Sequence, residues 1–307
     1  MLLAGCFGGQ EQSTRSEAQL RAETELSRGI RAEQKGDRLD AEQFLLQSLT
    51  TSSSIEDNPS RATALINLAR LYRLQHDLAK AETSIDQALA MIGIDSHLSA
   101  EAAYEKALVE LARDSLDTAL EWSQKAVAAE RGNALGRRLN LAGRIQVMRG
   151  RWNDAEALAG KALIENRSAG QAEEEANSLR ILGTVARHEK KNELGARFLQ
   201  EALQIDKRIG KSSKIAADLG ELAETARGAG NLRDSSAYLE RAYEVNLAGG
   251  RLREAMENQE ALAGIYTTLG DEKKAAQARE TVRNLELRTE SQKPGSSSTT
   301  INPSSRP

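Results

Sequence analysis

The chain has 307 residues, of which 39% are hydrophobic, 28% are charged and only 3% are aromatic, and its formal net charge is −3 at pH 7. This charge argues against nucleic acid as a partner, because binding to the phosphate backbone needs a basic surface. The single cysteine excludes an internal disulfide framework, and no run of eighteen apolar residues is present to span a membrane.

The first six residues, MLLAGC, resemble the end of a bacterial lipoprotein signal peptide, which is cleaved before the cysteine. The resemblance implies that residues 1–6 are a remnant of that signal and that Cys6 carries the lipid. Residues 7–17 would then form a flexible tether, and Phe7 at the second mature position is typical of sorting to the outer membrane. A basic region and a full hydrophobic stretch do not precede the cysteine. The alternative is an ordinary apolar segment in which Cys6 is incidental.

Small residues recur through the next 270 or so positions at nearly constant intervals of 40, 38, 36, 40, 40 and 40 residues. These anchor residues are Ala41, Ala81, Ala119, Ala155, Gly195, Ser235 and Ala275. A second set stands twelve residues before the anchors, at Gly29, Ala69, Ala107, Gly143, Gly183, Ala223 and Ala263. A third set follows seven residues after them, at Ser48, Ala88, Ala126, Ala162, Ala202, Ala242 and Val282. Three sets in phase predict a helical solenoid.

The second repeat shows the expected unit most clearly. Residues 64–72 predict a first helix, residues 75–77 a turn, and residues 78–92 a second helix. Small residues at the points where two helices cross allow their backbones to approach closely. Glycines after the second helices are expected to cap them, at Gly93, Gly132, Gly170, Gly210 and Gly249.

This pattern resembles the tetratricopeptide repeat, with a unit nearer 40 residues, as in the subclass typified by kinesin light chains. The resemblance is carried by Leu68, Ala69, Tyr72, Asp77, Ala81 and Ala88, and again by Leu182, Gly183, Gly195, Ala202, Leu262, Ala263, Tyr266 and Ala275. It implies an all-α, right-handed superhelical solenoid of about seven helix-turn-helix repeats over residues 18–287. Residues 288–307 are rich in Ser, Thr and Pro and are expected to be a disordered tail.

Chemistry-bearing motifs are incomplete in this sequence. The histidines lie in three different repeats, at His76, His97 and His188. The pair His188-Glu189 begins like a zinc-protease helix, but the position of the second ligand holds Asn192. The run 210–212 resembles the end of a phosphate-binding loop, but Ile205 stands where its first glycine is needed. We therefore expect no enzyme activity, no metal site and no bound cofactor.

In tetratricopeptide solenoids the first helices of successive repeats line the concave face, and helical spacing predicts which residues are exposed there. The predicted groove residues are Arg70, Arg73, Leu74, Tyr104, Leu108, Leu111, Arg137, Asn140, Arg144, Val147, Met148, Asn177, Arg180 and Arg187. This set suits a peptide with acidic and hydrophobic residues, because arginine binds carboxylates bidentately. In the alternative, these arginines pair with neighbouring glutamates of the same solenoid. Glu101 and Glu105 stand where chaperone-binding members need Lys or Arg, which disfavours that adaptor role.

The expected function is a non-enzymatic scaffold for protein–protein interaction. As a lipoprotein it would be anchored in the bacterial outer membrane, face the periplasm, and touch the membrane through its lipid alone. A partner protein or peptide would bind in the concave groove, as in the assembly of a secretion, pilus or other envelope complex. The alternative is a cytoplasmic regulator or adaptor that senses a peptide.

Overall fold

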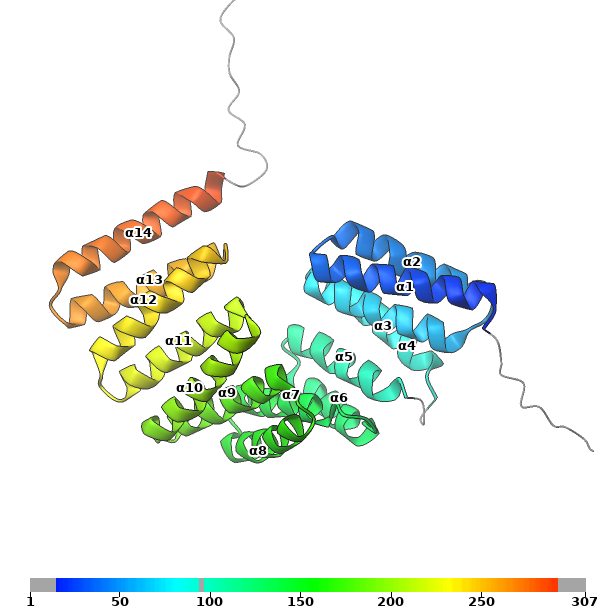
Figure 1. The fold of residues 1–307 in the computed structure, drawn as a ribbon, viewed down its shortest axis with the longest axis horizontal. Coiled ribbons are helices and arrows are strands. Elements are labelled where there is room, and N and C mark those ends of the chain that lie inside the picture. The colour runs from blue at the N-terminus through cyan, green and yellow to red at the C-terminus, as the bar shows by residue number, and fades with distance from the viewer. Residues whose placement is uncertain (1–14, 94–96, 292–307) are drawn as a thin grey trace, which may run out of the picture. The chain divides into compact units, whose positions relative to one another are not determined.

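A computed structural model describes residues 15–93 and 97–291. Over those two ranges every regular element is an α-helix (Figure 1), so the all-α repeat fold is confirmed. The helices are α1 (Glu17–Lys35), α2 (Arg38–Ser54), α3 (Asn58–Leu74), α4 (Leu78–Met91), α5 (Ser99–Ala112), α6 (Leu116–Ala129), α7 (Leu135–Met148), α8 (Trp152–Ser168), α9 (Ala172–His188), α10 (Asn192–Ile209), α11 (Ser212–Gly228), α12 (Leu232–Ala248), α13 (Leu252–Thr268) and α14 (Glu272–Ser291).

The helices pack as two compact units, Met1–Gly150 (unit 1) and Arg151–Pro307 (unit 2). Unit 1 contains α1 to α7, and unit 2 contains α8 to α14. Helix α14 continues to Ser291, beyond the predicted end of the solenoid at residue 287. The predicted lipid site Cys6, most of the predicted tether and residues 292–307 lie outside the described ranges. The predicted hand of the superhelix stays a prediction.

The anchor residues and their partners mark the crossings between paired helices. Ala41, Ala81 and Ala275 are 0% exposed, and the other anchors are also buried. In the α9–α10 hairpin, a Cβ at Gly183 would lie 2.6 Å from Leu199 Cγ, and one at Gly195 would lie 3.0 Å from the carbonyl oxygen of Gly183. The small residues are therefore required by backbone proximity, as the repeat pattern predicts.

Each turn between the two helices of a repeat has one residue with a left-handed backbone, five positions before the anchor. These residues are Gly36, His76, Asp114, Gly150, Lys190, Gly230 and Gly270. The next helix is often capped by a side chain: Asp77 Oδ1 accepts from the Lys80 amide at 3.2 Å, and Asp271 Oδ1 accepts from the Lys274 amide at 3.1 Å. The turn thus ends one helix and begins the next within two or three residues.

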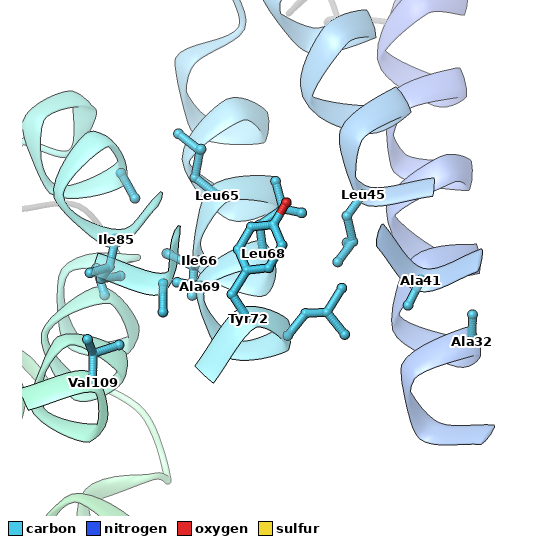
Figure 2. Close-up of a cluster of buried hydrophobic side chains, with 14 residues drawn as sticks. Ala32, Ala41, Leu45, Leu65, Ile66, Leu68, Ala69, Tyr72, Ile85 and Val109 are labelled. Carbon is cyan, nitrogen blue, oxygen red and sulfur yellow. The ribbon is translucent and has the colours of Figure 1, made fainter. Parts of the chain in front are cut away.

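Leucine and aromatic side chains fill the spaces beside the small residues. In unit 1 one cluster of buried side chains extends from Ala41 and Leu45 through Leu68 and Tyr72 to Ile85 (Figure 2). Unit 2 has comparable clusters of buried side chains, including Leu199, Leu203, Leu219, Leu222, Leu262 and Tyr266. Among the described residues, no helix is both long and apolar enough to cross a bilayer.

Candidate partner-binding surface

The predicted groove residues of unit 1 lie on the first helices of repeats two, three and four, which are α3, α5 and α7. Those predicted in unit 2 lie on α9. Their environments fall into three kinds: arginines held in ion pairs by carboxylates of the same unit, side chains that are buried or half-buried, such as Tyr104 and Asn140, and side chains that are exposed to solvent. The distinction decides which of them can meet a partner.

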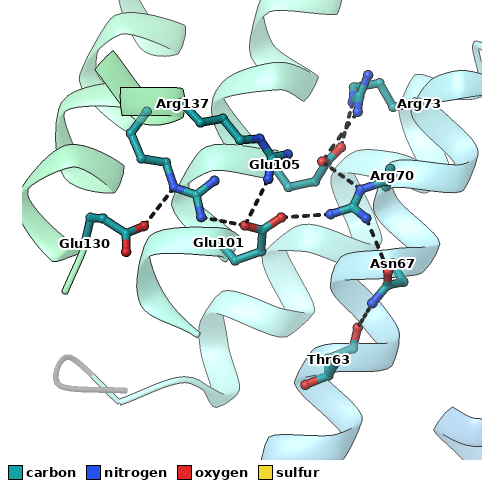
Figure 3. A network of polar contacts seen from close by, with 9 residues as sticks. Thr63, Asn67, Arg70, Arg73, Glu101, Glu105, Glu130 and Arg137 are labelled. Carbon is teal, nitrogen blue, oxygen red and sulfur yellow. Dashed lines mark hydrogen bonds and ion pairs between the residues drawn. The ribbon is translucent and has the colours of Figure 1, made fainter. Parts of the chain in front are cut away.

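Two arginines of α3 are held by two glutamates of α5. Arg70 Nη2 donates to Glu101 Oε1 at 2.8 Å, and Arg73 Nε donates to Glu105 Oε1 at 2.6 Å (Figure 3). The Glu105 side chain is 0% exposed, and Arg70 Nε lies 3.7 Å from its second oxygen. These ion pairs therefore connect the first helices of two successive repeats.

The same network continues from α5 to α7. Arg138 Nη2 donates to Glu101 Oε2 at 2.5 Å, and Arg137 Nη1 lies 3.8 Å from that oxygen. Both guanidinium groups stand over the Tyr104 ring, 4.3 and 4.5 Å from its centroid, in cation–π geometry. Burial raises the pKa of Glu101, but Arg138, Arg137 and Arg70 outweigh burial and hold that pKa below its ordinary value. Glu101 is therefore a stable anion shared by three arginines.

The predicted arginine rim is thus largely neutralised in unit 1. Arg70, Arg73 and Arg137 have carboxylate partners within the unit, as in the alternative interpretation of the sequence. Arg138 is not among the predicted groove residues; its side chain is 4% exposed and forms a second ion pair with Glu130 at 3.2 Å.

The apolar residues of the predicted groove divide in a similar way. Leu108 and Leu111 are half-buried and pack against the core of unit 1, whereas Leu74 and Met148 are 48% and 50% exposed. Leu74 and Met148 stand at the same repeat position, seven residues before their anchors, and Ala112 occupies that position in the repeat between them. All three are exposed. We call Leu74, Ala112 and Met148 the apolar stripe.

The remaining predicted residues on α7 surround the end of this stripe. Asn140 is buried, Val147 is half-buried and Arg144 is exposed. Arg144 precedes Met148 by four residues, so the two side chains share a helix face. Unit 1 therefore presents an exposed apolar stripe, flanked by Arg144 on α7, on helices that are braced by ion pairs.

In unit 2, Arg180 is the centre of a buried cluster that joins α9, α10 and α11. It donates from Nη2 to Asp206 Oδ2 at 2.6 Å, from Nε to Asp218 Oδ1 at 2.7 Å, and from Nη1 to Asn177 Oδ1 at 2.7 Å. Both aspartates are 0% exposed. The predicted groove residues Arg180 and Asn177 therefore hold helices together.

The two aspartates together carry more negative charge than Arg180 can balance. Burial raises the pKa of Asp218 to about 7; Arg180 opposes the rise and the neighbouring Asp206 adds to it. Asp206 Oδ1 and Asp218 Oδ2 are buried and accept no hydrogen bond from any residue that the structure describes. A proton on Asp218 supplies a donor at this place, so protonation satisfies the pair.

The last predicted residue, Arg187, lies at the end of α9 and is only partly satisfied. Its Nη2 donates to Glu221 Oε2 of α11 at 3.3 Å, whereas its Nε is buried and has no acceptor among the described residues. The neighbouring His188 ring stacks on Trp152 of α8, with centroids 3.7 Å apart and planes at 18°. Arg187 thus borders the solvent, and residues 15–93 and 97–291 do not use all of its hydrogen-bond donors.

The family comparison matches residues 20–92 to the tetratricopeptide repeat. No curated protein matches the chain. Among solved structures, a Rap protein complexed with competence and sporulation factor superposes with a TM-score of 0.67 at 13% identity, covering 89% of this chain and 78% of that one. The apo form of RapI gives 0.67 at 12% identity, covering 87% and 77%.

A signal transduction ATPase with a tetratricopeptide repeat sensor, from Pyrococcus horikoshii, gives a TM-score of 0.70 at 15% identity. It covers 87% of this chain, but this chain covers only 43% of that protein. Identities this low establish a shared helical-repeat fold and say nothing about the chemistry of a binding surface.

Proposed function

We propose that this chain is a tetratricopeptide repeat protein that binds a segment of a partner protein along the apolar stripe of unit 1. The repeat fold supports a protein-interaction scaffold. The observation that carries the location is the exposure of Leu74, Ala112 and Met148 at one repeat position on three successive first helices. Aligned apolar side chains that remain in water favour binding a complementary apolar segment.

The ion-pair network gives this stripe a rigid support. Glu101 and Glu105 connect α3, α5 and α7, so the helices that carry the stripe are braced before a partner arrives. A preformed surface loses less conformational entropy on binding. We propose a partner segment with apolar side chains against the stripe and a carboxylate beside Arg144, which retains the acidic and hydrophobic character expected from the sequence.

Substitution within the stripe tests this location. The double variant Leu74→Asp/Met148→Asp places two charges where apolar contact is proposed, while both side chains are half exposed and the fold should tolerate the change. The control is Ile164→Asp on α8, a similar change at a side chain that is 69% exposed. Full-length proteins would be purified from the native bacterium and their bound proteins quantified by mass spectrometry.

We expect one or a few partners to be depleted at least tenfold by the stripe variant and to be retained by the Ile164 control. Equal recovery with the wild-type chain and the stripe variant would contradict the proposed location.

We further propose that Cys6 is lipidated and that the scaffold acts in the bacterial envelope, on the periplasmic side of the outer membrane, in the assembly of an envelope complex. The support is the Leu-Ala-Gly-Cys sequence at residues 3–6. Metabolic labelling with a fatty-acid analogue, in the native gene context, tests the anchor. Label that is present in the wild-type chain and absent from Cys6→Ser supports lipidation of Cys6, whereas an unlabelled wild-type chain contradicts it.

The second candidate is a cytoplasmic regulator that senses a peptide. It is favoured by the fold likeness to a Rap protein that was solved with competence and sporulation factor. In both candidates the stripe binds a segment of a protein or peptide, and the proposed role is binding without catalysis. Cell fractionation distinguishes them: the first predicts membrane-associated protein that becomes soluble in Cys6→Ser, and the second predicts soluble protein in both.

A further inference from the structure

The repeat position that is apolar in repeats two to four of unit 1 is surrounded by basic groups in repeats five and six of unit 2. Seven residues before their anchors stand His188 on α9 and Gly228 on α11, and the preceding residues are Arg187 and Arg227. In repeats three and four that preceding position holds the apolar Leu111 and Val147, and in repeat two it holds Arg73, which pairs with Glu105. From repeats three and four to repeats five and six, this edge therefore changes from apolar to basic side chains.

Two adjoining hollows mark this basic edge of unit 2. One, of about 480 Å³, is lined by Arg187, His188 and Arg227 together with Lys190 and Asn192. The other, of about 580 Å³, is lined by Lys191, Leu194 and Arg197, and again by Lys190 and Asn192. Lys190 and Asn192 belong to both hollows, so the two form one continuous surface at the α9–α10 turn.

The charges of this surface are only partly balanced from within the chain. Arg187 pairs with Glu221, Lys191 with Glu189, and Arg227 with Glu224. The side chains of Lys190 and Arg197, in contrast, have no hydrogen bond or ion pair with any described residue. The Asn192 amide, which is half-buried, also lacks a hydrogen-bond partner there.

Lys190 also has an unusual backbone for its residue type. Its φ is +62°, at the turn position that four other repeats fill with glycine. A side chain is disfavoured in this left-handed region because its Cβ approaches the backbone. A lysine at this position therefore lowers the stability of the fold. Its ammonium group has no partner among the described residues whose interaction would offset this loss.

We propose that the surface made by Lys190, Arg197, Asn192 and Arg187, the acidic-segment site, binds a carboxylate-rich segment of a partner protein. Arg197 and Arg187 can each receive a carboxylate in a separate hollow, with Lys190 between them, while the Asn192 amide suits a peptide backbone. Leu194, which is 41% exposed, adds an apolar contact at the rim. The site lies within unit 2 and does not depend on the apolar stripe.

A peptide fits this surface better than a polyphosphate or an anionic membrane. Glu193 and Glu224 also line the hollows, and the chain carries a net charge of −3. Dense negative charge would be repelled by these groups, whereas separated carboxylates can avoid them. The acidic segment is therefore expected to carry its carboxylates at intervals, with uncharged residues between them.

The test measures binding of a fluorescein-labelled twelve-residue peptide of Glu-Leu-Gly repeats to the full-length protein by fluorescence anisotropy. The site variant is Lys190→Glu/Arg197→Glu. The control, Lys161→Glu/Lys207→Glu, makes the same charge change at two exposed positions on α8 and α10 that line neither hollow. The proposal predicts at least tenfold weaker binding for the site variant and less than twofold for the control.

A third variant, Lys190→Gly, distinguishes a loss of binding caused by the missing ammonium group from one caused by misfolding. It removes the ammonium group and relieves the left-handed backbone, so it should raise the melting temperature and still weaken binding severalfold. The proposal is overturned if the wild-type chain does not bind the peptide or if the control loses affinity as much as the site variant. It is also overturned if the site binds a twenty-nucleotide oligothymidine, or vesicles with anionic lipid, more tightly than it binds the peptide.

Discussion

At the scale of single residues, Arg180 and the two buried aspartates form a tightly constrained group. One guanidinium holds Asp206 and Asp218 from two helices at 2.6 and 2.7 Å, in a place where neither carboxylate reaches solvent. Burial raises the pKa of Asp218 to about 7, and the nearby Lys214 has its pKa lowered by burial and by Arg180. The stability of unit 2 should therefore depend on pH near neutrality.

The sign of that dependence follows from the protons bound in each state. Between the ordinary value of 3.8 and about 7, Asp218 holds a proton when folded and has lost it when unfolded. The free energy of unfolding consequently falls as pH rises through this range, by up to about 1.4 kcal/mol per pH unit. Urea denaturation at a series of pH values from 4 to 8 measures this change in the free energy of unfolding.

The matched variant is Asp218→Asn, which resembles the protonated carboxyl and does not titrate. Relative to this variant, the wild-type chain should lose stability from pH 4 to 7 and then remain level. Parallel curves for the two proteins across that range would mean that Asp218 does not hold a proton in the folded state.

Glycines in helices give a second prediction at this scale, because the same substitution should have opposite effects at two sites. Gly195→Ala places a Cβ 3.0 Å from the Gly183 carbonyl oxygen and 3.3 Å from the Arg187 amide nitrogen, and these backbone atoms cannot move freely. We expect a loss of about 1–3 kcal/mol. Gly264→Ala on α13 meets nothing within 4 Å and should gain about 0.5–1 kcal/mol from helix propensity.

Thermal or urea unfolding of both glycine variants checks the prediction. A Gly195→Ala protein as stable as Gly264→Ala would show that α9 and α10 do not approach as closely as the repeat pattern requires.

At the scale of helices, carboxylates on the first helix of one repeat form ion pairs with arginines on the first helix of the preceding repeat. Glu105 of α5 is 0% exposed and pairs with Arg73 of α3 at 2.6 Å. Glu105→Gln leaves Arg73 and Arg70 without this anion, and we expect a loss of about 3 kcal/mol, because the arginines are partly exposed and the cost lies at the low end for a buried pair. Glu23→Gln removes an exposed pair with Arg15 and should cost under about 0.5 kcal/mol.

Chemical denaturation at low and high salt measures both losses. The Glu105 effect should persist at high salt, because buried pairs are weakly screened. A Glu105→Gln protein that matches Glu23→Gln in stability would contradict the brace between α3 and α5.

The sequence predicts the hairpins well because their packing depends on side-chain size alone. Only Ala, Gly or Ser fits where two helices cross, and such a requirement leaves a visible period at Ala41, Ala81 and the later anchors. The predicted helix ends agree less well with the structure. Helix α3 begins at Asn58, six residues before the predicted start, because Asp57 caps it by accepting a hydrogen bond from the Ser60 amide at 3.2 Å.

The groove arginines show what the sequence does not reveal directly. Helical spacing places Arg73 and Arg180 on an exposed face, but whether they are available depends on the next first helix. Their partners, Glu105 and Asp218, lie 32 and 38 residues later, which is slightly less than one repeat. A search for opposite charges at that separation would have found both pairs.

At the scale of the whole molecule, one repeat architecture presents two different chemistries. Unit 1 exposes the apolar stripe of Leu74, Ala112 and Met148, and unit 2 exposes the acidic-segment site around Lys190 and Arg197. A solenoid allows this because each repeat packs only on its neighbours, so exposed residues can change while the crossings stay the same. The function is accordingly expected to reside in surface residues that the repeat pattern does not constrain.

The central claim is that the apolar stripe contacts a partner protein, and site-specific photo-crosslinking in living cells tests it most directly. A benzophenone amino acid would replace Leu74 or Met148 in the full-length protein, with Ile164, 69% exposed on α8, as the matched control. We predict crosslinks to the same partner from positions 74 and 148 and none to it from 164. Crosslinks to that partner from 164 alone, or no crosslink from either stripe position, would contradict the claim.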